Sequence, residues 1–327
     1  MFRFIILYIN KEETLVFLEN FHGKTIYFVL KSNPTHCIML YEWCWGGIMK
    51  KLTLTLIFLI IFATYLVPAG AKEEFFAPVT LTVNEKYVNT KNHPYLTSGV
   101  TMVSFRDIGE IFSCDISWDE KTDNATLSSG GTNISVTKNK KTARVNGKNV
   151  SLVKSATIVN DRIYVPMRFI SETFGAHVSW NADTLTADIR SGKALVPSHL
   201  SGKAPYSADE LLWLSRIVSA ESAGETNRGK VAVANVILNR VKSPDFPDTI
   251  YGVIFDNKYG VQFTPTADGS IYNTPTTDSK IAAKRALLGE NVSNACLYFL
   301  NPDIATNFWI VNNRTFYQSI GNHDFYL

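Results

Sequence analysis

A glutamate closes an apolar stripe in the last third of the chain. Leu214, Val218 and Glu221 are spaced i, i+4 and i+7, so they share one face of the helix that this pattern predicts. Burial on an apolar face disfavours the charged carboxylate and raises its pKa, as a general acid working near neutral pH requires. A glutamate near a helix end can also be a solvated residue or a cap for its neighbours, and the spacing alone leaves both alternatives open.

Two helices must position this glutamate. Residues 207–210, Ser-Ala-Asp-Glu, form a capping box that opens the first helix, and the Ser-Ala-Gly-Glu segment at 222–225 ends it. A second helix is expected from about 227 to 241, because apolar residues recur there at helical spacing and Pro244 follows. Both helices lie in the second domain, which is expected to cover residues 204–327.

The run at 214–250, LSRIVSAESAGETNRGKVAVANVILNRVKSPDFPDTI, resembles the SleB-type spore cortex-lytic cell wall hydrolases. The family pattern is a helix ending A-E-x-x-G-E, then V-A-x-V-x-x-N-R-V, then F-P-x-T-I. Further matches follow in order: Q-F-T at 262–264, Y-F-L-N-P at 298–302 and I-G-N-H-D-F-Y at 320–326. One departure, Ser-Ala at 222–223 where the family often has Ala-Arg, removes a positive charge near the glutamates.

The resemblance implies a lysozyme-like catalytic domain that cleaves peptidoglycan glycan strands, with Glu221 as its catalytic residue. It also suggests lytic transglycosylation, in which Glu221 protonates the glycosidic oxygen, then takes the proton of the muramic 6-hydroxyl and leaves 1,6-anhydro ends. Hydrolysis by a muramidase would require a second carboxylate about 5–9.5 Å from the first. Glu225 is the candidate, although its charge equally suits the start of the next helix.

Aromatic and amide side chains in the matched segments fit a sugar cleft. Aromatic rings offer flat apolar faces, and amides can hydrogen-bond acetamido and hydroxyl groups. Phe299, Trp309 and Phe325 are expected to pack the core instead, since they alternate with those residues. His323 could donate to substrate or fix a loop. The expected substrate-binding set is Glu225, Gln262, Phe263, Tyr298, Asn301, Asn322, His323 and Tyr326.

Three alternatives to glycan cleavage can be weighed from the residues. A zinc-dependent peptidoglycan amidase would need about three protein ligands, often histidines, and residues 204–327 hold only His323. A cysteine peptidase could pair Cys296 with His323, but Cys296 lies in an apolar run where a buried thiol is expected. A non-catalytic wall-binding protein predicts that Glu221→Gln leaves function intact. We therefore expect neither a metal nor a cofactor.

Two segments before this domain repeat each other without a gap. Residues 103–127 and 165–189 align at an offset of 62, with nine identical positions. Each predicts a short amphipathic helix followed by a strand, and Asn146-Gly147 between them predicts a hairpin turn. We therefore expect residues 77–190 to form one α+β domain with an internal helix–strand repeat. The stretch at 191–203, rich in Ser, Gly and Pro, is expected to be a linker.

The run V-P-x-R-x-x-x-E-x-x-G-x-x-V-x-W at 165–180 resembles the stalk-type domain named after the amino terminus of copper amine oxidases. Copper does not follow, because His93 and His177 are the domain's histidines and no clustered ligand spacing is present. Trp118 and Trp180 occupy the same position of the repeat. Core packing is the expected role of both, with sugar stacking as the alternative, and the domain is expected to act in spacing or wall association.

Residues 49–71 have the three-part layout of a secretory signal peptide. A basic start at 49–51 precedes an uncharged apolar stretch at 52–66, and residues 67–71 end in an A-x-A pattern. The stretch is shorter than the ~20 residues needed to span a bilayer, which favours a cleaved signal peptide over the alternative, an uncleaved membrane anchor. Residues 1–48 are interpreted as upstream sequence translated from a wrongly chosen start codon. We expect a secreted protein of the cell wall or spore envelope that meets the membrane only during export.

The composition excludes several classes of protein. Of the 327 residues, 46% are hydrophobic and 19% are charged, unlike a disordered chain. Four cysteines cannot form a disulfide-dense scaffold, and a net charge of +3 gives no electrostatic case for binding nucleic acid. The partner that the family resemblance implies is peptidoglycan. The expected fold class is α+β, with a signal peptide, a stalk-type domain and then a mainly helical catalytic domain.

Overall fold

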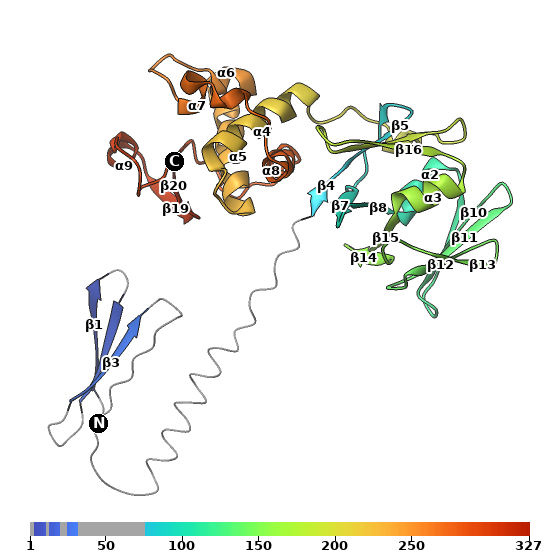
Figure 1. Cartoon of the computed structure of the whole chain (residues 1–327), viewed down its shortest axis with the longest axis horizontal. Coiled ribbons are helices and arrows are strands. Elements are labelled where there is room, and N and C mark those ends of the chain that lie inside the picture. The colour runs from blue at the N-terminus through green and yellow to red at the C-terminus, as the bar shows by residue number, and fades with distance from the viewer. Residues whose placement is uncertain (1–2, 11–12, 20–24, 32–75) are drawn as a thin grey trace, which may run out of the picture. The chain divides into compact units, whose positions relative to one another are not determined.

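The computed structural model divides the chain into two units, Met1–Glu74 and Phe75–Leu327. It describes the chain except for residues 1–2, 11–12, 20–24 and 32–75, so the signal peptide predicted at 49–71 lies outside the described residues. Among the described residues, no helix is both long and apolar enough to cross a bilayer. The interpretation of residues 1–48 as upstream translation stays a prediction. In the first unit one antiparallel sheet contains, in order, β1 (Arg3–Asn10), β2 (Glu13–Glu19) and β3 (Thr25–Lys31) (Figure 1).

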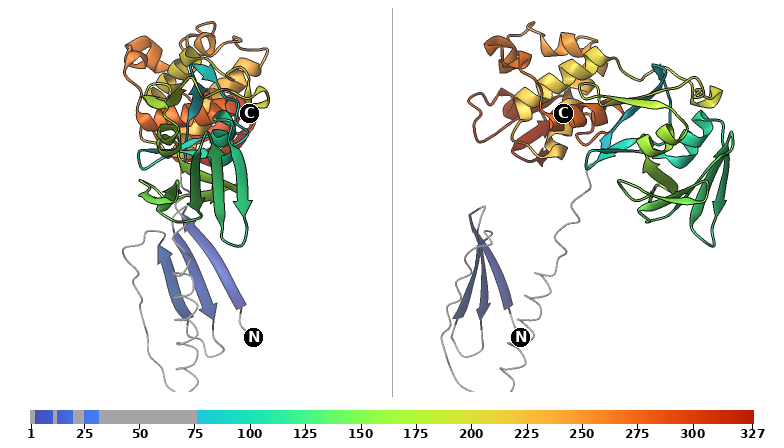
Figure 2. Two further views of the ribbon diagram at one scale, coloured as in Figure 1. Left: turned by 90° about the vertical axis from the view of Figure 1, so that its right-hand side faces the viewer. Right: turned by 45° about the vertical axis from the view of Figure 1, so that its right-hand side comes forward.

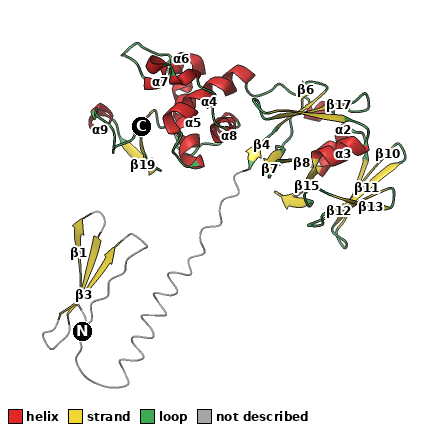
Figure 3. Cartoon of the chain, viewed as in Figure 1, coloured by secondary structure: helices red, strands yellow, loops and turns green. Residues whose placement is uncertain are grey.

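Strands dominate the first half of the larger unit (Figure 3). Along β5, Leu81 and Val83 are buried while Thr80 and Thr82, which alternate with them, are partly exposed, as expected for a sheet with one face on the core. The predicted hairpin turn at Asn146-Gly147 joins β12 to β13, and both residues have the positive φ that a two-residue turn needs, 49° and 81°. The strands are β4 (Ala77–Pro78), β5 (Thr80–Val83), β6 (Lys86–Tyr87), β7 (Tyr95–Thr97), β8 (Val100–Ser104), β9 (Asp115–Asp119), β10 (Asn124–Ser129), β11 (Thr132–Thr137), β12 (Thr142–Val145), β13 (Lys148–Ser151), β14 (Thr157–Val159), β15 (Arg162–Pro166), β16 (His177–Asn181) and β17 (Thr186–Arg190).

These strands form three sheets, ordered β13-β12-β11-β10-β9, β14-β15-β8-β7-β4 and β16-β17-β5-β6. Two seven-residue helices, α2 (Phe105–Ile111) and α3 (Met167–Thr173), lie in the two segments that repeat in sequence. The rings that follow them, Phe112 and Phe174, stack with centroids 5.0 Å apart. Each helix is followed by an antiparallel strand pair, β9 with β10 and β16 with β17. This arrangement gives one continuous core to an α+β domain.

The structure corrects the expected role of two tryptophans. Trp118 is 43% exposed and Trp180 is 39% exposed, so neither is a core residue. The physical reason is their place in the sheets. Each lies near the end of a strand that forms the edge of its sheet, β9 or β16, where no neighbouring strand covers the outer side. Their indoles are available to contact something outside the chain.

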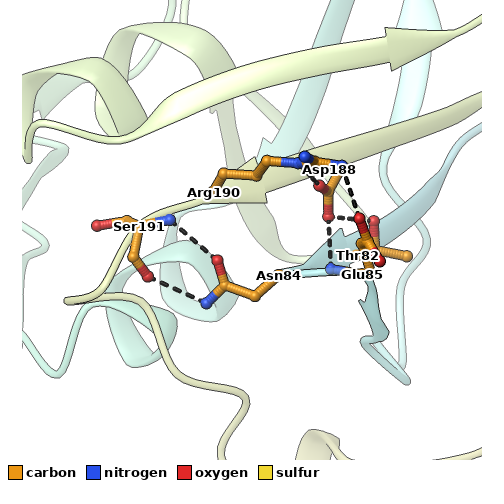
Figure 4. Close-up of polar contacts among 6 residues, drawn as sticks. All are labelled: Thr82, Asn84, Glu85, Asp188, Arg190 and Ser191. Atoms are coloured by element: carbon orange, nitrogen blue, oxygen red, sulfur yellow. Dashed lines mark hydrogen bonds and ion pairs between the residues drawn. The ribbon is translucent and has the colours of Figure 1, made fainter.

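A buried carboxylate joins β17 to β5, which run parallel (Figure 4). Asp188 accepts hydrogen bonds from the Thr82 hydroxyl at 2.7 Å, the Glu85 amide at 3.0 Å and Nε of Arg190 at 2.7 Å. Burial opposes ionisation, but these three donors hold the pKa of Asp188 below its usual value. The carboxylate therefore fixes β5, near the start of the domain, against its last strand, β17.

The second half of the larger unit is mainly helical, with one small sheet in the order β18-β20-β19 (Figure 2). The predicted capping box is present: Ser207 accepts from the Glu210 amide, and the Glu210 carboxylate accepts from the Ser207 amide. Helix α8 packs against both α4 and α5 around a separate apolar core. The elements are α4 (Ala208–Ser222), α5 (Asn227–Lys242), α6 (Ile250–Ile254), α7 (Thr264–Asp268), α8 (Thr277–Leu287), β18 (Tyr298–Leu300), α9 (Trp309–Asn313), β19 (Phe316–Ile320) and β20 (His323–Tyr326), with short 3-10 turns at Ser198–Leu200 and Ser270–Tyr272.

Helix α5 fixes the segment that leads into β18. The buried amide of Asn235 donates to the Glu290 carbonyl at 2.7 Å and accepts from the Val292 amide at 2.9 Å. One turn later, Asn239 donates to the carbonyls of Asn294 and Cys296. These main-chain groups lie outside the strands, so the asparagine side chains supply the hydrogen bonds that a sheet would otherwise provide. The bonds hold the segment against α5.

The stretch predicted as a linker packs against the first domain. Ala194 and Leu200 are buried in that domain's core, and the Leu200 carbonyl accepts from the Asn89 amide at 2.7 Å. Farther along, the fully buried Lys284 of α8 donates from Nζ to the carbonyls of Thr184, at 2.9 Å, and Leu185, at 2.7 Å. Lys284 therefore links α8 to the strand-rich domain by hydrogen bonds, and the amino-acid composition gave no sign of this contact.

Candidate active site

Glu221 lies one residue before the end of α4, where the apolar stripe of Leu214 and Val218 meets the surface. Its side chain is partly buried. Burial raises the pKa of Glu221 to about 7, the negative charge of Asp268 adds to the rise, and the Arg240 guanidinium opposes it. A carboxyl group with this pKa is partly protonated at neutral pH, so it can donate a proton and afterwards hold a negative charge.

Arg240 is the group that sequence reasoning missed. It comes from α5 and is only 5% exposed, and its Nε donates to the Leu297 carbonyl at 2.7 Å. The guanidinium lies over three rings, with centroids 4.9 Å away at Phe246, 5.3 Å at Phe263 and 5.4 Å at Tyr298. Burial lowers the pKa of Arg240 to about 10, which leaves it charged at neutral pH. Its buried Nη1 has no hydrogen-bond partner among the described residues.

A sequence signal for Arg240 does exist. Val233, Ile237 and Arg240 are spaced i, i+4 and i+7 on α5, and the first two are fully buried. This is the pattern that singled out Glu221: a charge ending an apolar stripe. Asp268, at the end of α7, carries no comparable signal. Hydrogen bonds from Ser270 hold the pKa of Asp268 below its usual value, so it remains ionised.

Glu225 is buried, and its carboxylate is occupied by the chain itself. Oε2 accepts from the Asn322 amide at 3.1 Å, and Oε1 accepts from Nδ2 of the same residue at 2.9 Å. Nδ1 of His323 lies 3.6 Å from Oε1, and burial lowers the pKa of His323, with Glu225 opposing that effect. Gly321 passes so close that an added Cβ would collide with Oε2 of Glu225. Glu225, Asn322 and His323 thus form one cluster that holds the turn between β19 and β20.

The other predicted residues divide into buried and accessible ones. Phe263 and Tyr326, expected to offer faces to a sugar, are 4% exposed and pack in the domain. Phe263 is held under the Arg240 guanidinium. Tyr298 is partly exposed, and the Arg314 guanidinium lies 4.6 Å from its ring centroid.

Two amides and one tryptophan complete this part of the surface. Gln262 is partly exposed and donates to the Gly260 carbonyl at 3.2 Å. Asn301 is also partly exposed, and its Oδ1 accepts from the Asp303 amide at 3.0 Å within a turn. Trp309, expected in the core, is 48% exposed on α9, because that five-residue helix buries none of its residues. Its ring meets Tyr298 edge-on at 6.3 Å, so the two rings form one accessible aromatic surface.

The described residues do not bring together three or more His, Cys, Asp or Glu side chains that could hold a metal ion. His93, in the loop before β7, and His177, at the start of β16, therefore do not belong to a cluster of further ligands among the described residues. The donor set does not fit a copper site, which needs several imidazole or thiol ligands at one point. Cys296 is fully buried, and burial raises the pKa of its thiol to about 11, unlike a reactive cysteine.

Comparison with known families accounts for both domains. The Copper amine oxidase N-terminal domain family matches residues 82–189, and the Cell Wall Hydrolase family matches residues 224–326. A spore cortex-lytic enzyme of Halalkalibacterium halodurans is 40% identical over 138 residues, which are 42% of this chain and 41% of the relative. The carboxy-terminal domain belongs to the cell wall hydrolase family. The spore cortex-lytic enzyme of Bacillus subtilis is 41% identical over 120 residues, 37% of this chain and 38% of that protein.

The chain spans less than half the length of these curated relatives. Two solved structures also match. The catalytic domain of the germination-specific lytic transglycosylase SleB from Bacillus anthracis is 42% identical, with a TM-score of 0.36, over 38% of this chain and 100% of that chain. The catalytic domain of the Bacillus cereus SleB protein is 41% identical, with a TM-score of 0.34, over 38% of this chain and 98% of that one.

Proposed function

We propose that the protein is an exported enzyme that cleaves the glycan strands of peptidoglycan as a lytic transglycosylase. The observation that carries the proposal is the position of Glu221, a partly buried carboxyl group near the end of α4 with a pKa raised to about 7. The cell wall hydrolase family match supports the polymer. The relative described as a lytic transglycosylase supports the reaction type.

In the proposed reaction Glu221 acts first as an acid and then as a base. Its carboxyl proton goes to the oxygen that bridges N-acetylmuramic acid and N-acetylglucosamine, and the C1–O bond breaks as positive charge develops at the muramic C1. The new carboxylate accepts the proton of the muramic 6-hydroxyl, whose oxygen forms a bond to C1. The products are a 1,6-anhydro end and a free 4-hydroxyl on the leaving sugar, and Glu221 is protonated again.

Arg240 is proposed as a positioning residue for this cycle. Once Glu221 has given up its proton, the buried Arg240 guanidinium stabilises the negative charge of the carboxylate. The same attraction partly offsets the rise that burial causes in the pKa of Glu221. The three rings around Arg240 and its bond to the Leu297 carbonyl hold the cation in place. A fixed charge needs no reorganisation when the proton moves.

Glu225 is proposed as a second positioning residue rather than a second catalytic carboxylate. Its oxygens are bonded to Asn322, and its side chain is 5% exposed, so it has little access to an attacking water. It instead holds Asn322 and His323 at the turn between β19 and β20. Gln262, Tyr298, Asn301 and Asn322 remain proposed substrate contacts, since each is at least partly exposed.

Hydrolysis is the second candidate, because one observation favours it. Asp268 is exposed and ionised, and its charge acts on Glu221 strongly enough to raise that residue's pKa. An ionised carboxylate beside a protonated one is the pairing that hydrolysis uses. In that case Asp268 would activate water, and the products would carry reducing ends.

The test is release of soluble fragments from purified peptidoglycan by the full chain. We expect Glu221→Gln to lower the release rate by about 100-fold or more, since general acid catalysis contributes roughly that factor. Glu120→Gln removes a charge at an exposed turn of the other domain and serves as the matched control. Unchanged release by Glu221→Gln would contradict the role of Glu221, whereas no release by the parent chain would leave a non-catalytic wall-binding role as the better account.

A further inference from the structure

A groove of about 400 Å³ runs beside Trp180 in the strand-rich domain. Its lining residues come from the edge strand β16, from the β7–β8 hairpin and from the segment that includes Val153. Met167 and Arg168, at the start of α3, also line it. The volume lies within the range of small-ligand sites, which is roughly 300–1,000 Å³.

The exposed indole needs an explanation that the core does not provide. Trp118 and Trp180 are identical residues at equivalent positions of the repeat, and both are about 40% exposed. A large aromatic side chain that remains in both copies without filling the core contributes little to folding. An exposed aromatic side chain beside a groove is a common mark of a binding site. Trp180 lines this groove and Trp118 does not, so the two tryptophans differ in whether they lie beside it.

The chemistry of the groove suits a sugar polymer with negative charges. Trp180 offers a flat apolar face, and Val100 and Val153 extend the apolar surface. The hydroxyls of Thr101 and Ser179 lie among the lining residues and can bond sugar hydroxyls. Arg168 places a guanidinium at the rim, where its exposed pairing with Glu172 at 2.9 Å is a weak one.

We propose that this groove is a second binding site for peptidoglycan glycan, separate from the active site. Trp180 stacks on the apolar face of an N-acetylated sugar ring, and Arg168 pairs with the carboxylate of a neighbouring muramic lactyl group. The proposal rests on the proposed function, because that function supplies the polymer. The site would keep the enzyme on insoluble wall between cleavage events.

The experiment measures binding of the full chain to insoluble peptidoglycan in a Glu221→Gln background, in which cleavage is absent. Adding Trp180→Ala is expected to raise the apparent Kd about fivefold or more, as truncation of an aromatic anchor does. Trp118→Ala is the matched control, with the same residue type, repeat position and exposure, and should change the Kd less than twofold. Trp180→Phe, which keeps a flat ring, should retain most of the binding. Equal effects of Trp180→Ala and Trp118→Ala would overturn the proposal.

Two further arms identify the occupant and separate this site from catalysis. Binding should persist on glycan strands stripped of their peptides, and loss of the Trp180 effect on that material would assign the groove to peptide and overturn the proposal. With Glu221 intact, Trp180→Ala should cleave short soluble glycan at the unaltered rate while releasing less from intact wall. A failure of Glu221-dependent cleavage would refute the proposed function, whereas an unchanged Kd in Trp180→Ala would refute the groove alone.

Discussion

Replacing Glu221 by glutamine should change the stability of the protein in a pH-dependent way. In the unfolded chain the Glu221 carboxyl has a pKa of 4.5, whereas in the folded protein its pKa is about 7. Below about pH 4 the carboxyl is protonated in both states and contributes nothing to the difference. Between these two values the unfolded state loses its proton first, so the free energy of unfolding falls as the pH rises, and it levels off above about pH 8.

The magnitude follows from the two pKa values. The interval between 4.5 and about 7, at about 1.4 kcal/mol for each pH unit, corresponds to a stability cost of up to about 3 kcal/mol at pH 8. Glutamine is neutral at every pH and does not bear this cost. Relative to the parent protein, Glu221→Gln should therefore gain up to about 3 kcal/mol between pH 4 and pH 8.

Urea unfolding, followed by circular dichroism at several pH values, measures the difference between the two proteins. Subtracting the unfolding free energy of the parent from that of Glu221→Gln at each pH cancels the contribution of every other carboxyl group. Glu120→Gln, at an exposed turn, controls for the loss of a charge. A difference between Glu221→Gln and the parent that is the same at pH 4 and pH 8 would show that burial does not raise the pKa of Glu221, and the proposed acid would lose its basis.

Further predictions concern the surroundings of this residue. Arg240→Met removes the charge that lowers the pKa of Glu221, so the alkaline limb of the pH–activity profile should move to higher pH, whereas Arg240→Lys should leave it nearly in place. Gly321→Ala would drive a Cβ into the Glu225 carboxylate and should lower the melting temperature far more than Gly289→Ala, whose position also has positive φ but lies in open space. Lys284→Ala removes two buried hydrogen bonds and opens a cavity, which should cost about 2–4 kcal/mol of unfolding free energy in calorimetry; a loss below about 0.5 kcal/mol would mean that the contact is not formed.

Much of the catalytic domain could be predicted because its signals are local. The capping box of Ser207 and Glu210, the end of α4 and the extent of α5 depend on neighbouring residues, and the structure has them where the sequence indicated. The environment of Glu221 also followed from a local rule, since its place on the apolar stripe determines its burial. Arg240 obeys the same rule and was identifiable by it.

Other features depended on contacts between distant parts of the chain. Asn322 lies 97 residues from Glu225, and no periodicity relates them, so the sequence could not show that the Glu225 carboxylate is already occupied. The aromatic residues were misjudged for a similar reason. Trp180 was expected in the core and Phe263 at the surface, because residue type and motif do not say which faces are covered; the structure has Trp180 39% exposed and Phe263 4% exposed.

The identity of the peptidoglycan fragments tests the central claim most directly. Purified chain with Glu221 intact would be incubated with peptidoglycan and the released muropeptides analysed by mass, alongside Glu221→Gln and Asp268→Asn. The account predicts 1,6-anhydro-muramic ends, abolished by Glu221→Gln and retained by Asp268→Asn. Reducing ends that disappear in Asp268→Asn would indicate hydrolysis with two carboxylates. Freed peptides, or fragments that persist in Glu221→Gln, would contradict the assignment of Glu221 as the residue that cleaves the glycan.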